Sequence, residues 1–385
     1  MEITNAQLIL PDQIRRGNLT IRDGRIHKIT FGKPRKTRGE KINLNGDFLS
    51  PGFIDLHIHG AMGRDTMEAT PEAFKKITEF HLRGGTTSLT LTTLSAAQKD
   101  ILNVLEAAKP CRNKSLGGSR IVGVHVEGPF ISLEKVGAQN PEFVRNPSAR
   151  EWGPILKYGK LVTQMTLAPE LPRAQALISA LKKNGSIPSG GHTNADEKTL
   201  EPALKAGMNQ STHTFNAMSS VIKRGAYRAA GMLEFSLARD EMACELIADG
   251  EHVPPVCMRM LFNAKPRNKV VIITDATKGA GLKPGTKFEL YGIKCRVTPV
   301  TATVVDGTGL AGSTLTMIRA IQTAVEKAGV PLVDAVLAAT QNPARQLNRT
   351  KDLGALTPGK RADLVQFNNK FKIKKVWLDG AASSN

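Results

Sequence analysis

Two histidines one residue apart are the feature of this sequence that most directly suggests chemistry. His57 and His59 lie near the end of the segment PGFIDLHIHG, and its mostly apolar residues 53–56 are typical of a buried strand. Because side chains at positions i and i+2 project from the same face of a strand, both imidazoles can point into one pocket. Gly60 directly after the pair indicates that the strand opens into a turn there. Two neutral imidazoles that converge in this way suit a divalent transition metal.

Three further residues form a second candidate set of metal ligands. Glu127 ends the apolar run of GVHVEGPF, where a carboxylate is costly to bury unless it is paired or binds a metal. His192 follows two glycines, and His213 lies between two threonines. Together they supply two imidazoles and one carboxylate, which leaves a coordination position open for water.

An acidic residue also ends a third apolar run. Asp275 closes KVVIITDA, a run of β-branched residues typical of a buried strand. A bound divalent ion lowers the pKa of a water ligand toward about 7, and Asp275 is placed to take the water's proton and pass it to a leaving amine. The combined set predicts amide hydrolysis. Taken singly, these residues also have simpler interpretations: a turn aspartate, a cap or surface glutamate, and histidines without a ligand role.

The elements that must position these residues alternate along the middle of the chain. Strand-like segments alternate with helix-like ones, and the candidate residues, His252 among them, lie at or just past the carboxyl ends of strands. That is where (β/α)8 barrels build their active sites, so we expect an α/β fold of the TIM-barrel type. Besides the strand that carries His57, the expected strands are 85–94, 120–130, 161–170, 186–193, 210–215, 244–250 and 269–276, and the clearest helices are 71–83, 174–183, 195–206 and 316–327.

Both ends of the chain have a different character. Residues 1–48 and 346–385 contain short strands separated by turns, including an Asp23-Gly24 hairpin signal. We expect the two ends to combine into one small β-sandwich domain, with the barrel formed by residues 49–345.

Composition limits the classes of function. The chain has 385 residues, 41% hydrophobic content and a net charge of +19. The densest basic stretch, residues 33–38, has no aromatic residues to stack on bases, so we expect a solvated surface that favours anionic ligands and no nucleic-acid partner. We expect no signal peptide and no membrane-spanning segment. The four cysteines lack CxxC spacing, which is typical of reduced thiols in a cytoplasmic enzyme.

Seven segments in this order resemble the amidohydrolase superfamily and, within it, the N-acetylglucosamine-6-phosphate deacetylase family: PGFIDLHIHG, GVHVEGPFIS, GGHTNA, THTFNAMS, IADGEHV, ITDAT and GLAGSTLTM. The resemblance spans nearly the whole chain. It implies removal of acetate from N-acetylglucosamine 6-phosphate by a homodimer. The donor atoms accept Zn, Fe, Mn or Co, with one or two ions per subunit.

The resemblance also implies a role for each residue of the site. Glu127, His192 and His213 would hold the main metal, His57 and His59 a second one, and Asp275 would be the acid–base residue and touch the second metal. Ala138, Asn216, Ala217 and His252 would contact the substrate. An arginine would reach the phosphate from the partner subunit; counting back from Gly231 favours Arg228, with Arg224 as the alternative.

Two departures from the family leave alternatives open. Gln139 stands where the family usually has histidine, and Val136 where it has lysine, so a related substrate such as N-acetylgalactosamine 6-phosphate is the alternative. Amidohydrolases with a carboxylated lysine are not favoured, because the strand 161–168 contains none. A non-catalytic barrel that binds nucleic acid would be expected to lose one of the candidate catalytic residues, and all are present.

Overall fold

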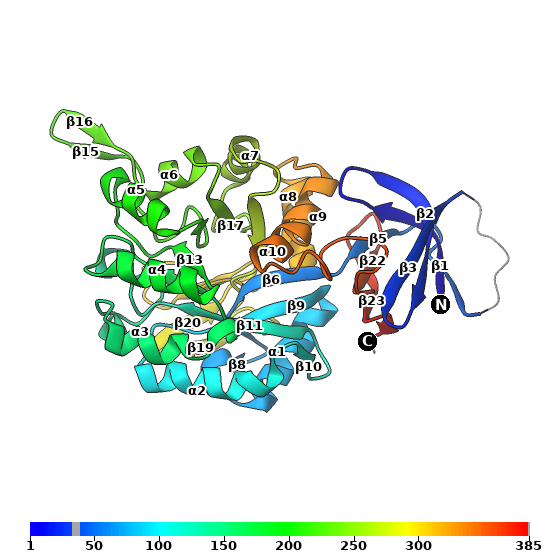
Figure 1. Cartoon of the computed structure of the whole chain (residues 1–385), viewed down its shortest axis with the longest axis horizontal. Helices are drawn as coiled ribbons and strands as arrows, with labels where there is room; N and C mark the ends of the chain where they lie inside the picture. The colour runs from blue at the N-terminus through cyan, green and yellow to red at the C-terminus, as the bar shows by residue number, and fades with distance from the viewer. Residues whose placement is uncertain (33–38, 384–385) are drawn as a thin grey trace.

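The structure is a computed structural model that describes residues 1–32 and 39–383. Figure 1 shows a large barrel and, beside it, a smaller sheet that contains both chain ends. The basic stretch 33–38 singled out by the sequence lies outside the described residues. None of the helices in the described ranges is long and apolar enough to cross a membrane.

Eight parallel strands form the barrel in the described part of the chain, as the sequence predicted. They pair in the order β6-β9-β11-β12-β13-β14-β17-β18. A parallel bridge between Ile58 and Ala276 brings the last strand back to the first. The strands are β6 (Phe53–Ile58), β9 (Thr86–Thr92), β11 (Arg120–Glu127), β12 (Val162–Leu167), β13 (Ile187–Gly190), β14 (Gln210–Ser211), β17 (Ala243–Ile247) and β18 (Val270–Ile273), with β10 (Lys114–Ser115) paired to β11.

A helix follows each barrel strand and covers the outside of the barrel. The first begins at a clear local signal: the side chain of Thr70 caps the helix by accepting a hydrogen bond from the amide of Ala73, and Pro71 occupies the first turn. The helices are α1 (Pro71–Arg83), α2 (Gln98–Ala108), α3 (Ala149–Leu156), α4 (Ala174–Asn184), α5 (Glu197–Ala206), α6 (Met232–Ala238), α7 (Pro255–Ala264), α8 (Met317–Glu326), α9 (Leu332–Ala338) and α10 (Gln341–Gln346). The four helices expected from the sequence are therefore confirmed.

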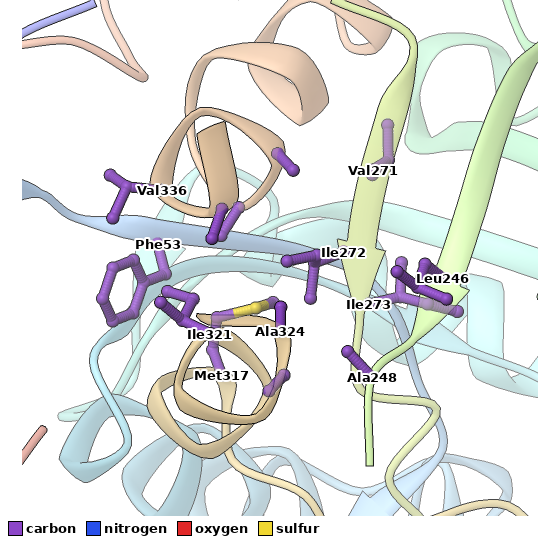
Figure 2. Packing of buried hydrophobic residues seen from close by; sticks show 14 of the residues in the cluster. Phe53, Leu246, Ala248, Val271, Ile272, Ile273, Met317, Ile321, Ala324 and Val336 are labelled. Carbon is purple, nitrogen blue, oxygen red and sulfur yellow. The ribbon is translucent and has the colours of Figure 1, made fainter. Parts of the chain in front are cut away.

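Helix α8 shows how these helices are held on the barrel. Met317, Ile321 and Ala324 lie on one helix face and are fully buried. Figure 2 shows them beside Phe53 and Ile272, which belong to β6 and β18 in the same apolar cluster. This packing holds β6, which positions His57 and His59, and β18, which leads to Asp275.

Strands from both termini combine into one sheet, so the two chain ends form one small β domain, as expected. The sheet runs β24-β23-β22-β5-β1-β2-β3, with β4 beside β1. A buried ion pair between Arg120 and Asp363, 2.6 Å apart, joins it to barrel strand β11. The strands are β1 (Glu2–Ile9), β2 (Ile14–Arg22), β3 (Arg25–Phe31), β4 (Lys41–Asn43), β5 (Phe48–Pro51), β22 (Leu364–Phe367), β23 (Ile373–Leu378) and β24 (Ala381–Ala382).

Three small elements lie outside the sequence prediction. A two-stranded hairpin follows β14, and Figure 1 shows it extending away from the barrel. A three-stranded sheet follows β18, and a short hairpin follows β6. These strands are β15 (Ile222–Arg224) and β16 (Tyr227–Ala229); β19 (Lys287–Leu290), β20 (Ile293–Val297) and β21 (Ala302–Val304); and β7 (Gly60–Ala61) and β8 (Arg64–Asp65).

Candidate active site

The barrel brings all the candidate metal ligands to one place. His57 and Glu127 belong to the ends of β6 and β11, and the others follow their strands closely in the chain. All are buried, with at most 8% of any residue exposed. They fall into two groups, and within each group the ligand atoms lie within 4.8 Å of one another. The first group is Glu127, His192 and His213, and the second is His57, His59 and Asp275.

The first group has the spacing of a metal site. Oε1 of Glu127 lies 3.2 Å from Nε2 of His213 and 3.5 Å from Nε2 of His192. The two imidazole nitrogens are 3.0 Å apart. Donor atoms bound to one tetrahedral zinc ion at about 2.1 Å lie roughly 3.4 Å apart. The residues therefore fit a divalent cation.

The second group has similar spacing and shares Glu127 with the first. Nε2 of His57 and Nε2 of His59 are 3.2 Å apart. Oδ1 of Asp275 lies 3.4 Å from the first nitrogen and 3.2 Å from the second. Glu127 faces this group as well, with Oε1 3.3 Å from His57 and Oε2 3.2 Å from His59. Its carboxylate can therefore serve both groups.

Hydrogen bonds behind the ligands orient two of the imidazoles. Nδ1 of His192 lies 2.8 Å from the carbonyl oxygen of Lys135. Because a carbonyl can only accept, Nδ1 carries the hydrogen, and Nε2 presents a lone pair to the site. Nδ1 of His57 faces a carboxylate oxygen of Glu245 at 3.4 Å. Each of these partners keeps Nε2 directed toward the other ligands.

Charge in the cluster is balanced by protons when no cation is bound. Burial alone would lower the pKa of His59, but Asp275 and Glu127 raise that pKa to about 9. The pKa of His57 is likewise well above 6.5, because the charges of Glu127 and Asp275 outweigh its burial. Burial alone would raise the pKa of Glu127, but the positive charge of His57 lowers it well below 4.5. Protons therefore occupy the imidazoles that a cation would need.

Cation uptake is therefore expected to depend on pH. His59 must lose its proton before Nε2 can bind a metal, so affinity should rise as the pH increases toward about 9 and binding should release protons. Isothermal titration of the metal-free protein with Zn²⁺, in buffers of different ionisation enthalpy, measures this release. Proton-free binding with one affinity from about pH 6 to pH 9 would contradict the assignment of His59 as a ligand.

A cavity of about 350 Å³ opens beside the two groups. That volume is within the usual range for small-molecule sites. His59, Asp275 and the first metal group line it, together with every predicted substrate residue except the arginine: Ala138, Asn216, Ala217 and His252. Nδ1 of His252 lies 2.6 Å from a carboxylate oxygen of Asp249, so this nitrogen is engaged and Nε2 is left for a ligand.

Arg228 does not line the cavity of its own subunit. It lies in β16, on the exposed hairpin that Figure 1 shows extending from the barrel. Arg224 occupies the opposite strand, β15, and only its backbone is among the described parts of the chain.

One buried carboxylate of the site was missed from the sequence. Glu245 in β17 is fully buried and accepts hydrogen bonds from Gln164 (2.9 Å), Gln210 (2.8 Å) and the backbone amide of His213 (3.2 Å). The segment ACELIA carries the same signal that identified Glu127, an acidic residue within an apolar strand. Leu290 and residues in the segment 309–312 also line the cavity, but their sequence contains no signal of this kind.

Comparison with known proteins places the chain in the Amidohydrolase family. Residues 48–382 match the sequence model of the Amidohydrolase family. An N-acetylglucosamine-6-phosphate deacetylase from Bacillus subtilis (strain 168) is 36% identical over 367 residues, covering 94% of this chain and 91% of the relative. An N-acetylgalactosamine-6-phosphate deacetylase from Escherichia coli O157:H7 is 30% identical over 341 residues, covering 88% of this chain and 89% of the relative. A solved structure of a variant N-acetyl-D-glucosamine-6-phosphate deacetylase from Mycobacterium smegmatis, in complex with N-acetyl-D-glucosamine-6-phosphate, has a TM-score of 0.91 and 28% identity, covering 100% of this chain and 99% of that one.

Proposed function

This chain belongs to the amidohydrolase family, and we propose that it is an N-acetylglucosamine-6-phosphate deacetylase. The reaction consumes water, breaks the acetamide C–N bond and releases acetate and glucosamine 6-phosphate. The observation that carries the proposal is the pair of ligand groups that share Glu127 and lie beside a cavity of small-molecule size. We propose the glucosamine epimer because the 36% identical relative acts on it, whereas the galactosamine-specific relative is 30% identical.

Each ligand group has a task in this reaction. A divalent cation held by Glu127, His192 and His213 would polarise the acetamide carbonyl and lower the pKa of a water molecule. Asp275 is the general base that accepts the water's proton and then delivers it to the leaving nitrogen. In the metal-free protein, burial alone would raise the pKa of Asp275, but the positive charges of His57 and His59 lower it. His57 and His59 supply the donors for a second cation.

The remaining cavity residues suit a sugar ring. His252 offers Nε2 and Asn216 offers its amide as hydrogen-bonding groups, and the small side chains of Ala138 and Ala217 leave space beside them. We propose that these four residues hold the sugar so that its acetamide faces Asp275.

We further propose that the enzyme is a cytoplasmic homodimer. In this dimer, Arg228 of one subunit binds the phosphate group of the substrate that lies in the cavity of the other subunit. Among the described residues that line the cavity, Lys135 is the only lysine or arginine, so a phosphate dianion lacks a guanidinium partner within one subunit. In the hairpin that carries Arg228, Tyr227 is 80% exposed, and Val221, directly before the first strand of the hairpin, is 53% exposed. These apolar side chains suit an interface between copies. The four free cysteines agree with a reducing compartment.

Replacing Arg228 by alanine is expected to raise KM for the phosphorylated sugar by about 10- to 100-fold, since a charge-assisted hydrogen bond is lost. Turnover of unphosphorylated N-acetylglucosamine should not change. Arg224→Ala is the matched variant, because it removes the same charge from the opposite strand of the hairpin. If Arg224→Ala alone produced the phosphate-dependent effect, the assignment to Arg228 would be wrong.

Chelation tests the metal dependence of the proposal. Acetate release from N-acetylglucosamine 6-phosphate should stop when the protein is stripped of metal and return when Zn²⁺, Fe²⁺, Mn²⁺ or Co²⁺ is added back, since the donor set accepts all four. Full activity in a protein shown by elemental analysis to be metal-free would overturn it.

A further inference from the structure

Gln139 has a buried side-chain amide that is fixed at both ends. Its Nε2 donates a hydrogen bond of 2.6 Å to Oε2 of Glu127. Its Oε1 accepts a hydrogen bond of 2.7 Å from the backbone amide of Ser95. Because a backbone N–H can only donate, Ser95 determines which way the amide faces. The N–H of Gln139 therefore points at the metal ligand.

The oxygen of Glu127 that Gln139 contacts is the one that faces His59 of the second ligand group. Oε2 of Glu127 lies 3.2 Å from Nε2 of His59. The other oxygen, Oε1, lies 3.2 to 3.5 Å from the Nε2 atoms of His57, His192 and His213. A donor on Oε2 therefore holds the carboxylate in the rotation that directs Oε2 to His59 and Oε1 to the other three imidazoles.

This hydrogen bond differs in kind from the other close contacts of Glu127. The imidazole nitrogens around the carboxylate carry no hydrogen once they bind a cation. Among the described residues, Gln139 is then the one remaining hydrogen-bond donor to Glu127. Outer hydrogen bonds to ligating carboxylates are known to tune metal affinity by about 10- to 100-fold.

We propose that Gln139 is a positioning residue that aligns Glu127 for both ligand groups and so supports binding of the cation at His57, His59 and Asp275. The inference rests on the metal-dependent part of the proposed function. It also gives Gln139 a role other than reading the sugar epimer, because its oxygen and one N–H are already engaged by the protein.

The test compares metal affinities of the wild type and Gln139→Met, which keeps the length of the side chain and removes the donor. Metal-free protein is titrated with Zn²⁺ in competition with a chromophoric chelator, which gives the number and affinity of sites. We expect two sites in the wild type and, in the variant, one site unchanged and the other weakened by about 10- to 100-fold. Gln139→Asn, whose amide is too short to reach Glu127, should behave like Gln139→Met.

Asn140→Leu is the matched control. Its side-chain amide lies one residue further along and donates to the carbonyl of Tyr291 at 3.1 Å, away from Glu127. This variant should bind metal like the wild type. Unchanged affinity at both sites in the two Gln139 variants, or a rise in sugar KM alone, would overturn the inference. A wild type that binds a single ion per subunit would overturn it too, whereas a wild type that binds none would overturn the proposed function itself.

Discussion

Replacing Glu127 by alanine removes bound metal and turnover together. The carboxylate is 1% exposed and lies within 3.5 Å of the Nε2 atoms of all four candidate imidazole ligands. Its loss takes a ligand from both groups and leaves buried imidazoles without their counter-charge, so cation affinity falls at both. We expect turnover to drop at least about 10³-fold, equivalent to roughly 4 kcal/mol of transition-state stabilisation.

Elemental analysis and acetate release on the same sample measure this effect. Glu142→Ala is the control, because it makes the same chemical change at an exposed position of the same connection between β11 and α3. An active Glu127→Ala variant that retains its full metal content would show that Glu127 is not a ligand.

Replacing Asp275 by asparagine tests its role as the general base while the first ligand group stays intact. Asparagine has nearly the same shape but cannot accept the water's proton, so kcat should fall by about 10²- to 10⁴-fold with little change in KM. The ion held by Glu127, His192 and His213 should stay, since Asp275 belongs to the other group. Steady-state kinetics together with metal analysis give both quantities. Near-normal kcat in the metal-loaded variant would rule out Asp275 as the general base.

The barrel and the ligand groups were predictable because their signals are local. A strand that ends in His57 and His59 must present both side chains on one face. Glu127 and Asp275 each end an apolar run, and the carboxyl ends of barrel strands meet at one rim. The fold and the gathering of the candidate ligands at one rim therefore followed from short segments. Glu245 lies in the middle of an apolar strand rather than at its end, so only the wider signal of an acid within an apolar run would have identified it.

The features that escaped prediction depend on the path of loops. Gln139 reaches Glu127 from twelve residues away only because Ser95, from the connection after β9, holds its oxygen. The hairpin that carries Arg228 extends away from the barrel (Figure 1), and Arg228 does not line the cavity of its own subunit. The sequence of the hairpin gives no indication of what it contacts. The cavity wall around Leu290 comes from a separate small sheet whose position over the barrel mouth is set by tertiary packing.

Acetate release from three sugars tests the central claim most directly. Metal-loaded protein is offered N-acetylglucosamine 6-phosphate, N-acetylgalactosamine 6-phosphate and unphosphorylated N-acetylglucosamine, with metal content determined on the same sample. We predict strong turnover of N-acetylglucosamine 6-phosphate and far weaker turnover of the other two. If a protein that carries its metal released no acetate from any of the three sugars, the assignment of this chain as an amino-sugar phosphate deacetylase would be contradicted.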